Sequence, residues 1–252
     1  MMPDTRTKIN VRGVCFDNVT LAEAAMRLRE SVSQGRTETV FTPNSEIVQA
    51  CIDDPSLYPV VNASTLTIPD GIGVVKAARI LGTPLKGKVA GVELGREVLA
   101  FAAEDKIPVY LLGGKPGVAE MAADKLRGEI ANLPIVGTGD GYFEKTGSAN
   151  DTVIEKINAS GAEILFVCLG APLQEKWIIE NRDRMPRVRV FLGLGGSLDV
   201  YAGTVKRAPA LFIHLGLEWF YRLLREPRRI GRMMQLPKFY FGTWMYKLNG
   251  KK

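Results

Sequence analysis

Polar residues follow several apolar runs of this 252-residue sequence, at positions where the loops of a parallel sheet carry chemistry. Asp70 stands in IPDG, and a carboxylate at the end of a strand is a natural general base. Thr42 and Asn44 stand in TPNSE, after the preceding apolar run. Asp and Asn also cap helices and shape turns, so each position leaves a structural and a catalytic interpretation open.

The segment GAPLQEKW places Gln174 and Glu175 in the first turn of a predicted helix. The helix dipole favours a glutamate there without any further function. From the segment alone, neither residue is assigned a role.

Glycine-rich segments suggest a second kind of chemistry, because backbone N–H groups at a helix start can bind phosphate. Gly113 and Gly114 lie in LLGGKPGVAE, where an apolar run meets a helical pattern. A tight turn without a ligand is the alternative. GTGDGY at 137–142 and GLGGS at 193–197 lack the features of a dinucleotide fingerprint, so they give little support for an NAD site.

Metal-binding patterns are missing from the sequence. It contains one histidine, His214, and no D-x-D triplet in a predicted loop. Cys15, Cys51 and Cys168 are widely spaced and odd in number, which is typical of buried, reduced thiols in the cytoplasm. We therefore expect no metal and no cofactor.

Apolar runs alternate with helical patterns along most of the chain. The predicted strands are ETVFTPN, TLTIPDG, PVYLLGG, EILFVCLGAP and VRVFLGLGG. The predicted helices are residues 20–34, with a capping box at its start, and SEIVQACIDD, IGVVKAARIL, PGVAEMAADKLRGEI, DTVIEKINASG and LQEKWIIENRDRM. This order predicts an α/β fold, with a Rossmann-like, mostly parallel sheet flanked by helices.

Charge is distributed unevenly along the chain. Residues 204–252 contain 11 Lys or Arg and 2 Asp or Glu, a net charge of +9, so the whole-chain value of +6 leaves residues 1–203 at −3. A nucleic-acid enzyme would usually carry basic charge across its main cleft, which argues against that class. We predict a catalytic core over 1–203 and a helical, basic and aromatic appendage over 204–252.

The appendage combines cations with apolar side chains. Leu217, Phe220 and Leu224 have helical spacing before Pro227, and arginines, methionines and aromatics follow. This mixture is typical of a segment lying in the headgroup region of a membrane, and ordinary helices packed on the core are the alternative. No stretch approaches the roughly 20 apolar residues that span a bilayer, and the N-terminus lacks the apolar core of a signal peptide.

Read together, TPNSE, IPDGIGVV, LLGGKPGVAE, GAPLQEKW, GLGGSLDVYAGTVKRAP and GLEWFYRLLREPRR resemble, in this order, the WecG/TagA/CpsF glycosyltransferase family, also called family 26. The resemblance covers roughly residues 8–247. It implies a cytoplasmic enzyme, peripheral on the inner face of the cell membrane, that transfers a sugar from a UDP-sugar to an undecaprenyl-diphosphate-linked saccharide. The best-known branch transfers N-acetylmannosamine onto N-acetylglucosaminyl-diphospho-undecaprenol for wall teichoic acid. Other branches transfer N-acetylmannosaminuronic acid or build capsule and exopolysaccharide precursors.

The same resemblance assigns roles to individual residues. Asp70 becomes the candidate base, and Thr42 and Asn44 become neighbours that contact the sugar or the acceptor. The residues it places at the substrates are Gln174 at the active site, Asp199 near the nucleotide, and Arg222, Arg229 and Arg232 in the appendage. The expected partners are the UDP-sugar, the lipid-linked acceptor and the cytoplasmic membrane surface, with no nucleic acid and with possible self-association.

Two other function classes compete with this one. A nucleic-acid-binding module would explain the basic tail but not the mildly acidic core or the polar strand ends. An NAD-dependent oxidoreductase would fit the alternating strands and helices, but no glycine fingerprint has the required placement. The glycosyltransferase interpretation accounts for both the strand ends and the tail.

Overall fold

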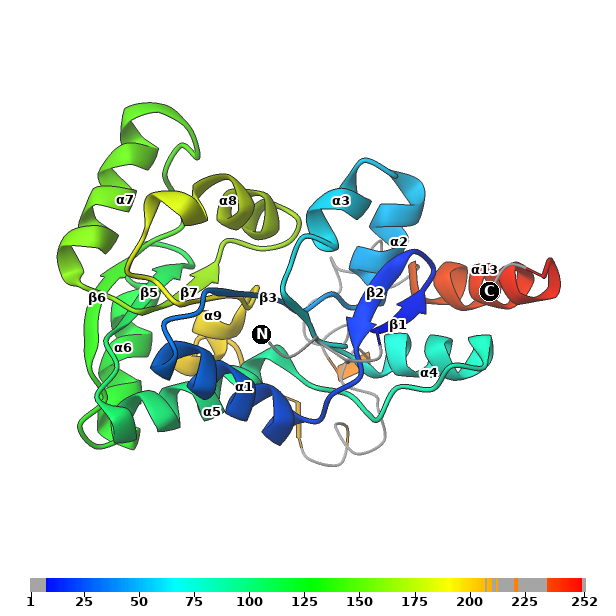
Figure 1. Ribbon diagram of the computed structural model, residues 1–252, viewed down its shortest axis with the longest axis horizontal. Helices are drawn as coiled ribbons and strands as arrows, with labels where there is room; N and C mark the ends of the chain where they lie inside the picture. Colours follow the sequence, from blue (N-terminus) through cyan, green and yellow to red (C-terminus); the bar gives the residue numbers. More distant parts are fainter. Residues whose placement is uncertain (1–7, 207, 210–211, 213–219, 222–234, 251–252) are drawn as a thin grey trace.

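A six-stranded parallel sheet forms the centre of the protein in the computed structural model, which describes residues 8–206, 208–209, 212, 220–221 and 235–250 (Figure 1). Its strand order is β4-β3-β8-β7-β5-β6. The strands are β3 (Glu38–Phe41), β4 (Leu66–Thr67), β5 (Val109–Gly113), β6 (Ile135–Gly139), β7 (Ile164–Cys168) and β8 (Val190–Gly193). All five neighbouring pairs are parallel, which confirms the predicted α/β class.

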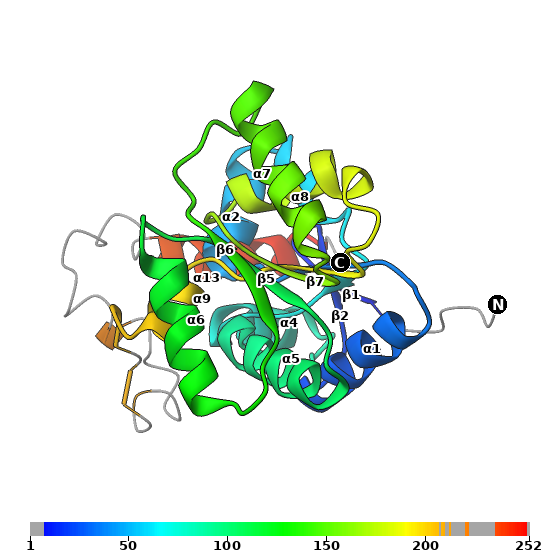
Figure 2. The ribbon, with the colours of Figure 1, turned by 90° about the vertical axis from the view of Figure 1, so that its left-hand side faces the viewer.

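Helices cover both faces of this sheet, which is why its central strands are continuous apolar runs. One face carries α1 (Leu21–Ser33), α5 (Gly91–Asp105), α6 (Val118–Glu129) and α9 (Ser197–Ala202). The other face carries α7 (Gly147–Ser160), α8 (Leu173–Asn181) and the short 3₁₀ helix η1 (Arg182–Arg184). Figure 2 shows the two helical layers on opposite sides of the strands. The predicted capping box of α1 is present, with Thr20 and Glu23 bonded reciprocally.

A smaller lobe lies beside the sheet and has its own apolar cluster (Figure 1). It comprises the antiparallel hairpin β1 (Lys8–Val11) and β2 (Val14–Asp17) with α2 (Ser45–Asp53), α3 (Leu57–Val61), α4 (Ile72–Leu81) and α13 (Gln235–Leu248). Since α2 follows β3 and α4 follows β4, the lobe is attached at the carboxyl ends of two strands of the sheet.

Helix α13, which falls in the segment predicted as a C-terminal appendage, packs on this lobe. Phe239 is fully buried in the lobe's cluster, and Lys238 Nζ lies 2.8 Å from both carboxylate oxygens of Asp53 in α2. Leu236 lies beside Gly73 of α4. Within the described part of the chain, no helix is both long enough and apolar enough to cross a membrane.

The β1–β2 hairpin, α3, α5, β6 and α9 were not predicted from the sequence. Two of these elements, β6 and α5, were missed because they contain glycines. In β6, a Cβ at Gly137 would lie 2.4 Å from the Tyr110 ring, and in α5 a Cβ at Gly95 would lie 2.3 Å from the Tyr201 hydroxyl. These glycines make room for aromatic rings, so their presence does not indicate loops.

Candidate active site

The loops after β3, β4 and β8 meet at the carboxyl edge of the sheet. Thr42 directly follows β3, is buried, and its Oγ1 donates a hydrogen bond to the carbonyl oxygen of Gly193, at the end of β8, at 3.1 Å. A Cβ at Gly71 would lie 3.7 Å from the Cβ of Asn44, so the IPDG and TPNSE loops are in contact. The structure therefore brings together the segments that carry Asp70, Thr42 and Asn44.

Asn44 caps helix α2, as the structural interpretation of its segment predicts. Its Oδ1 accepts the backbone N–H of Ile47 at 3.0 Å. The capping bond fixes the side chain at the edge of the sheet, and its amide nitrogen has no hydrogen-bond partner among the residues that the structure describes. Capping and contact with a substrate are therefore compatible at this position.

Asp70 lies between the end of β4 and the start of α4 and is half-buried. Gly71, and not Asp70, occupies the cap position of α4, with a φ of 93° that disfavours any side chain there. The expectation that Asp70 is simply an N-cap residue is therefore not supported.

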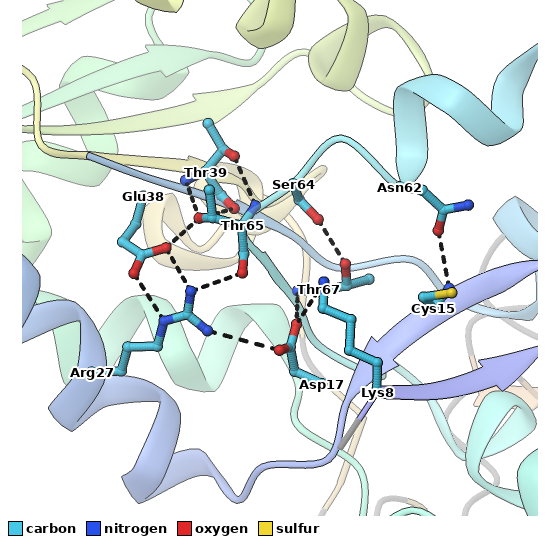
Figure 3. Close-up of polar contacts among 10 residues, drawn as sticks. All are labelled: Lys8, Cys15, Asp17, Arg27, Glu38, Thr39, Asn62, Ser64, Thr65 and Thr67. Carbon is cyan, nitrogen blue, oxygen red and sulfur yellow. Dashed lines mark hydrogen bonds and ion pairs between the residues drawn. The ribbon is translucent and has the colours of Figure 1, made fainter. Parts of the chain in front are cut away.

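A buried polar network holds β4, the short edge strand that leads to Asp70 (Figure 3). Asp17, at the end of β2, is fully buried and accepts the backbone N–H of Thr67 at 2.8 Å. Arg27 of α1 donates to both carboxylate oxygens of Glu38, at 2.9 and 2.8 Å, and to the carbonyl oxygen of Thr65 at 2.8 Å. Since β4 pairs with a strand on one side only, this network takes the place of a second neighbour.

The same network joins three elements that are distant in sequence. Arg27 Nη1 lies 3.8 Å from Asp17 Oδ1, and the Thr65 hydroxyl donates to Glu38. Hairpin, helix α1 and strand β3 thus converge at the amino end of β4, the strand that leads to Asp70. Sequence reasoning missed this support, because nothing local distinguishes Arg27 from the exposed arginine two positions later.

Gln174 connects the loops that follow β7 and β8. The side chain is 2% exposed; its Nε2 donates to Glu175 Oε1 at 2.9 Å and its Oε1 accepts the N–H of Gly195 at 2.9 Å. The preceding Ala171–Pro172 bond is cis. Gln174 therefore lies at the predicted edge, where its side chain fixes the glycine turn after β8.

Glu175 is a buried acid that sequence reasoning attributed to the helix dipole alone. Its side chain is 1% exposed, and burial raises its pKa while the hydrogen bond from Gln174 acts in the opposite direction. Its Oε2 has no hydrogen-bond partner among the described residues. An acid in this position costs folding free energy whenever it is ionised.

Gly113 and Gly114 form a tight turn at the end of β5. A Cβ at Gly113 would lie 2.3 Å from the carbonyl oxygen of Cys168 in β7, and that carbonyl accepts the N–H of Gly114 at 3.2 Å. The turn interpretation therefore accounts for both glycines. Their predicted contact with substrate stays a prediction.

Asp199 lies in the first turn of α9, after β8, and is half-buried. Its backbone carbonyl accepts the Thr204 hydroxyl at 3.0 Å and the N–H of Val205 at 3.1 Å. This holds the end of the core chain against the β8 loop, and the nucleotide contact of Asp199 stays a prediction. The remaining predicted site residues, Arg222, Arg229 and Arg232, lie outside the described part of the chain, as does His214.

Thiol and metal chemistry find little support at this edge. Cys15, Cys51 and Cys168 are free thiols, and burial raises the pKa of Cys51 to about 11 and that of Cys168 to about 12. Among the described residues, no group of three or more His, Cys, Asp or Glu is arranged to hold a metal ion. The carboxylate, hydroxyl and amide side chains of Asp70, Thr42 and Asn44 stay the predicted groups for chemistry at this edge.

Comparison with known proteins identifies the family. The sequence profile described as "Glycosyl transferase WecG/TagA/CpsF family" matches residues 9–252. The chain belongs to this family of glycosyltransferases. The N-acetylglucosaminyldiphosphoundecaprenol N-acetyl-beta-D-mannosaminyltransferase of Bacillus subtilis (strain 168) is 39% identical over 200 residues, covering 79% of this chain and 76% of the relative. The protein of the same name from Staphylococcus aureus (strain MRSA252) is 34% identical over 243 residues, covering 96% and 92%.

Membership of the WecG/TagA/CpsF family confirms the resemblance carried by the strand-end motifs. Those motifs fall at the carboxyl edge of the sheet, where open α/β folds bind their ligands. Asp70, Thr42 and Asn44 lie on neighbouring strand ends at one side, and Gln174 is linked to them through the β8 loop. Asp70 thus lies at the strand ends nearest the lobe, and its catalytic role stays a prediction.

Proposed function

We propose that the protein is an inverting glycosyltransferase that moves N-acetylmannosamine from UDP-N-acetylmannosamine to N-acetylglucosaminyl-diphospho-undecaprenol, forming a β-1,4 linkage in wall teichoic acid synthesis. The observation that carries the proposal is the grouping of Asp70, Thr42 and Asn44 at adjacent strand ends in a chain that aligns over 96% of its length with a relative of that name. Another UDP-sugar, such as one carrying N-acetylmannosaminuronic acid or glucose, is the alternative within the family, for capsule, exopolysaccharide or enterobacterial common antigen.

In this mechanism Asp70 acts as the general base. Its carboxylate takes the proton of the acceptor hydroxyl, whose oxygen forms the new bond to the anomeric carbon of the donor. The bond from that carbon to the diphosphate breaks on the opposite face, and UDP leaves with the electron pair. A diphosphate is a good leaving group, so one carboxylate suffices and no second acid is required.

Negative charge develops on the leaving diphosphate and needs stabilisation. Backbone N–H groups at helix starts and arginine side chains provide it, because a guanidinium matches phosphate oxygens in a two-pronged geometry. We assign the second role to Arg222, Arg229 and Arg232 of the appendage. With these groups the reaction requires no metal ion.

The outward face of α13 supports a peripheral position on the cytoplasmic membrane surface. Phe241 and Trp244 are 66% and 52% exposed, and Met245 and Leu248 extend the same stripe at helical spacing. Phe239, on the opposite side of the helix, is fully buried against the lobe. A helix docked through one face that leaves aromatic and aliphatic side chains exposed on the other, with the exposed Lys247 near its end, has the composition of an interfacial segment.

A donor panel tests the proposed function. Full-length protein is incubated with UDP-N-acetylmannosamine, UDP-N-acetylmannosaminuronic acid or UDP-glucose and a short-chain N-acetylglucosaminyl-diphospho-prenol, and products are identified by mass and linkage. Turnover with the first donor and a β-1,4 product is expected. Turnover with only another donor moves the protein to a different branch, and no turnover with any donor contradicts the proposal.

A further inference from the structure

A pocket of about 500 Å³ lies between α4 and α13 and belongs to none of the strand-end loops. Its described lining consists of Lys76, Arg79 and Ile80 from α4 and Tyr240 from α13. It thus combines two cations with an aliphatic and an aromatic wall. The proposed mechanism gives none of these four residues a role.

The two cations of the pocket are uncompensated. Lys76 and Arg79 are three positions apart, so they lie on the same face of α4, and both side chains are exposed. Neither has a carboxylate within ion-pair distance or a hydrogen bond in the described structure. By contrast, Lys238 of α13 is paired with Asp53. Two unpaired positive charges beside a hollow favour an anionic ligand.

The opposite wall of the pocket favours a ligand that is also partly apolar. Ile80 is half-buried, and Tyr240 presents its ring with a hydroxyl that has no partner among the described residues. Burial raises the pKa of Tyr240, so its hydroxyl keeps its proton at neutral pH and can donate to an anion. The exposed stripe of α13, residues 241, 244, 245 and 248, starts next to Tyr240 on the same helix.

The position of the pocket relative to Asp70 indicates which anion it takes. Helix α4 starts at Ile72, two residues after Asp70. With a rise of about 1.5 Å per residue, Lys76 and Arg79 lie about 6 Å and about 10 Å further along the helix axis. An acceptor whose hydroxyl meets Asp70 has its diphosphate one sugar ring away, a separation comparable to the distance along α4 to Lys76 and Arg79.

We propose that this pocket binds the diphosphate of the prenyl-diphosphate-linked acceptor, with Lys76 and Arg79 on the phosphate oxygens and Ile80 and Tyr240 against the first part of the hydrocarbon chain. The proposal rests on the proposed function, because it assigns a place to the acceptor of that reaction. The hydrocarbon chain of the acceptor then leaves the pocket beside the apolar stripe of α13, which would face the membrane surface.

Binding of farnesyl diphosphate, a short and soluble prenyl diphosphate, tests the pocket directly. Its Kd is measured by calorimetry for the full-length wild type, for Lys76→Ala/Arg79→Ala, and for Lys156→Ala/Arg187→Ala, a control that removes two exposed cations far from the lobe. Loss of two charge-assisted contacts is expected to raise the Kd tenfold or more in the first variant only. The affinity for UDP is expected to stay unchanged in both variants.

Three results would overturn the inference. The first is a Kd for farnesyl diphosphate that is the same in Lys76→Ala/Arg79→Ala and in the wild type. The second is wild-type binding of inorganic diphosphate as tight as that of farnesyl diphosphate, which would indicate a plain anion site. The third is loss of binding to phosphatidylglycerol vesicles in the variant with unchanged affinity for farnesyl diphosphate, which would indicate a bilayer headgroup site.

The measurements distinguish an error in the pocket assignment from an error in the proposed function. If the wild type transfers no sugar, but its farnesyl diphosphate affinity depends on Lys76 and Arg79, the proposed function is wrong and the pocket is supported. If the wild type transfers sugar and the double variant keeps the wild-type KM for the lipid acceptor, the pocket assignment is wrong and the function stands. In the expected result, the KM for the acceptor rises and the KM for the UDP-sugar does not.

Discussion

Single residues at the carboxyl edge of the sheet differ in how far the fold uses them. The Thr42 hydroxyl donates to Gly193, and the Asn44 side-chain oxygen caps α2. Asp70 stands one residue before the cap position of α4, at the same edge. Structural hydrogen bonds therefore explain in part why Thr42 and Asn44 occupy their positions, whereas helix capping does not explain Asp70.

Replacing Asp70 tests the general base. Asp70→Asn is expected to lower turnover by roughly 10²- to 10⁴-fold, the usual contribution of a positioned base, with little change in UDP-sugar affinity. The matched control is Asp140→Asn. Asp140 also directly follows a strand of this sheet, but that strand, β6, is the edge strand on the side opposite β4. Steady-state kinetics of both variants decide the point, and near-normal turnover of Asp70→Asn would remove the residue from this role.

The buried acid Glu175 predicts a pH dependence of stability. Its pKa in the folded protein is raised above the ordinary value of 4.5, so the folded state holds the proton more tightly than the unfolded state. Stability from this group is complete below pH 4.5 and decreases as pH rises from there through the raised pKa. Urea unfolding between pH 4 and pH 8, as proposed test conditions, is expected to show Glu175→Gln gaining stability relative to wild type as pH rises. Parallel pH curves for the two proteins would contradict the expectation.

Among the elements, strand β4 depends most on its surroundings. It has two residues and one neighbouring strand, and the Asp17–Arg27–Glu38 network supplies the rest of its support. Breaking a buried ion pair by removing one partner costs about 3–5 kcal/mol, because the other charge stays buried without compensation.

Two arginines of α1 give a matched comparison of this support. Arg27→Ala is expected to lower the free energy of unfolding by about 3–5 kcal/mol. Arg29→Ala removes surface ion pairs with Glu104 and Asp105, each of which is worth about 0–1 kcal/mol. Denaturant unfolding measures both, and equal losses would show that the network is not the main support of β4.

Helix α13 has two faces with different expected functions. Phe239→Ala opens a cavity in the lobe and is expected to cost about 3–5 kcal/mol of stability. Trp244→Ala alters only the exposed stripe, so it is expected to leave stability unchanged and to weaken binding to anionic vesicles. Thermal unfolding and vesicle co-sedimentation separate the two effects; a stable Trp244→Ala protein with unchanged vesicle binding would contradict the membrane assignment.

The whole molecule joins a sheet-based core to a lobe that the appendage helps to cover. The core boundary at 203/204 stays a prediction, and truncation after Thr204 tests it. Since the six strands of the parallel sheet, the β1–β2 hairpin and both helical layers precede that point, the truncated chain is expected to fold, with lower stability because Phe239 is lost from the lobe. It is also expected to lose vesicle binding and most turnover on a water-soluble acceptor analogue. Full activity on that analogue would show that the appendage contributes no group to the site.

The architecture was largely predictable from sequence because strands and helices alternate and are separated by segments that contain Gly, Pro or Asn. Five of the six parallel strands were predicted, and the segments that follow them place Asp70, Thr42 and Asn44 at one edge of the sheet. The roles of these residues came from the family resemblance and stay predictions. The burial of Glu175 and the Arg27 network were not predictable, since both depend on contacts between distant segments. The GTG segment of β6 was misleading because glycine there serves the Tyr110 ring.

The attachment of the lobe has a mechanical consequence. Asn44 caps α2, Asp70 stands two residues before α4, and α13 packs against both helices, so the three helices form one packed group at the ends of β3 and β4. A small displacement of this group would move Asn44 and Asp70 together and change their distance from the glycine turn after β8. A force on the outer face of α13 would therefore act first on the spacing between Asp70 and that turn.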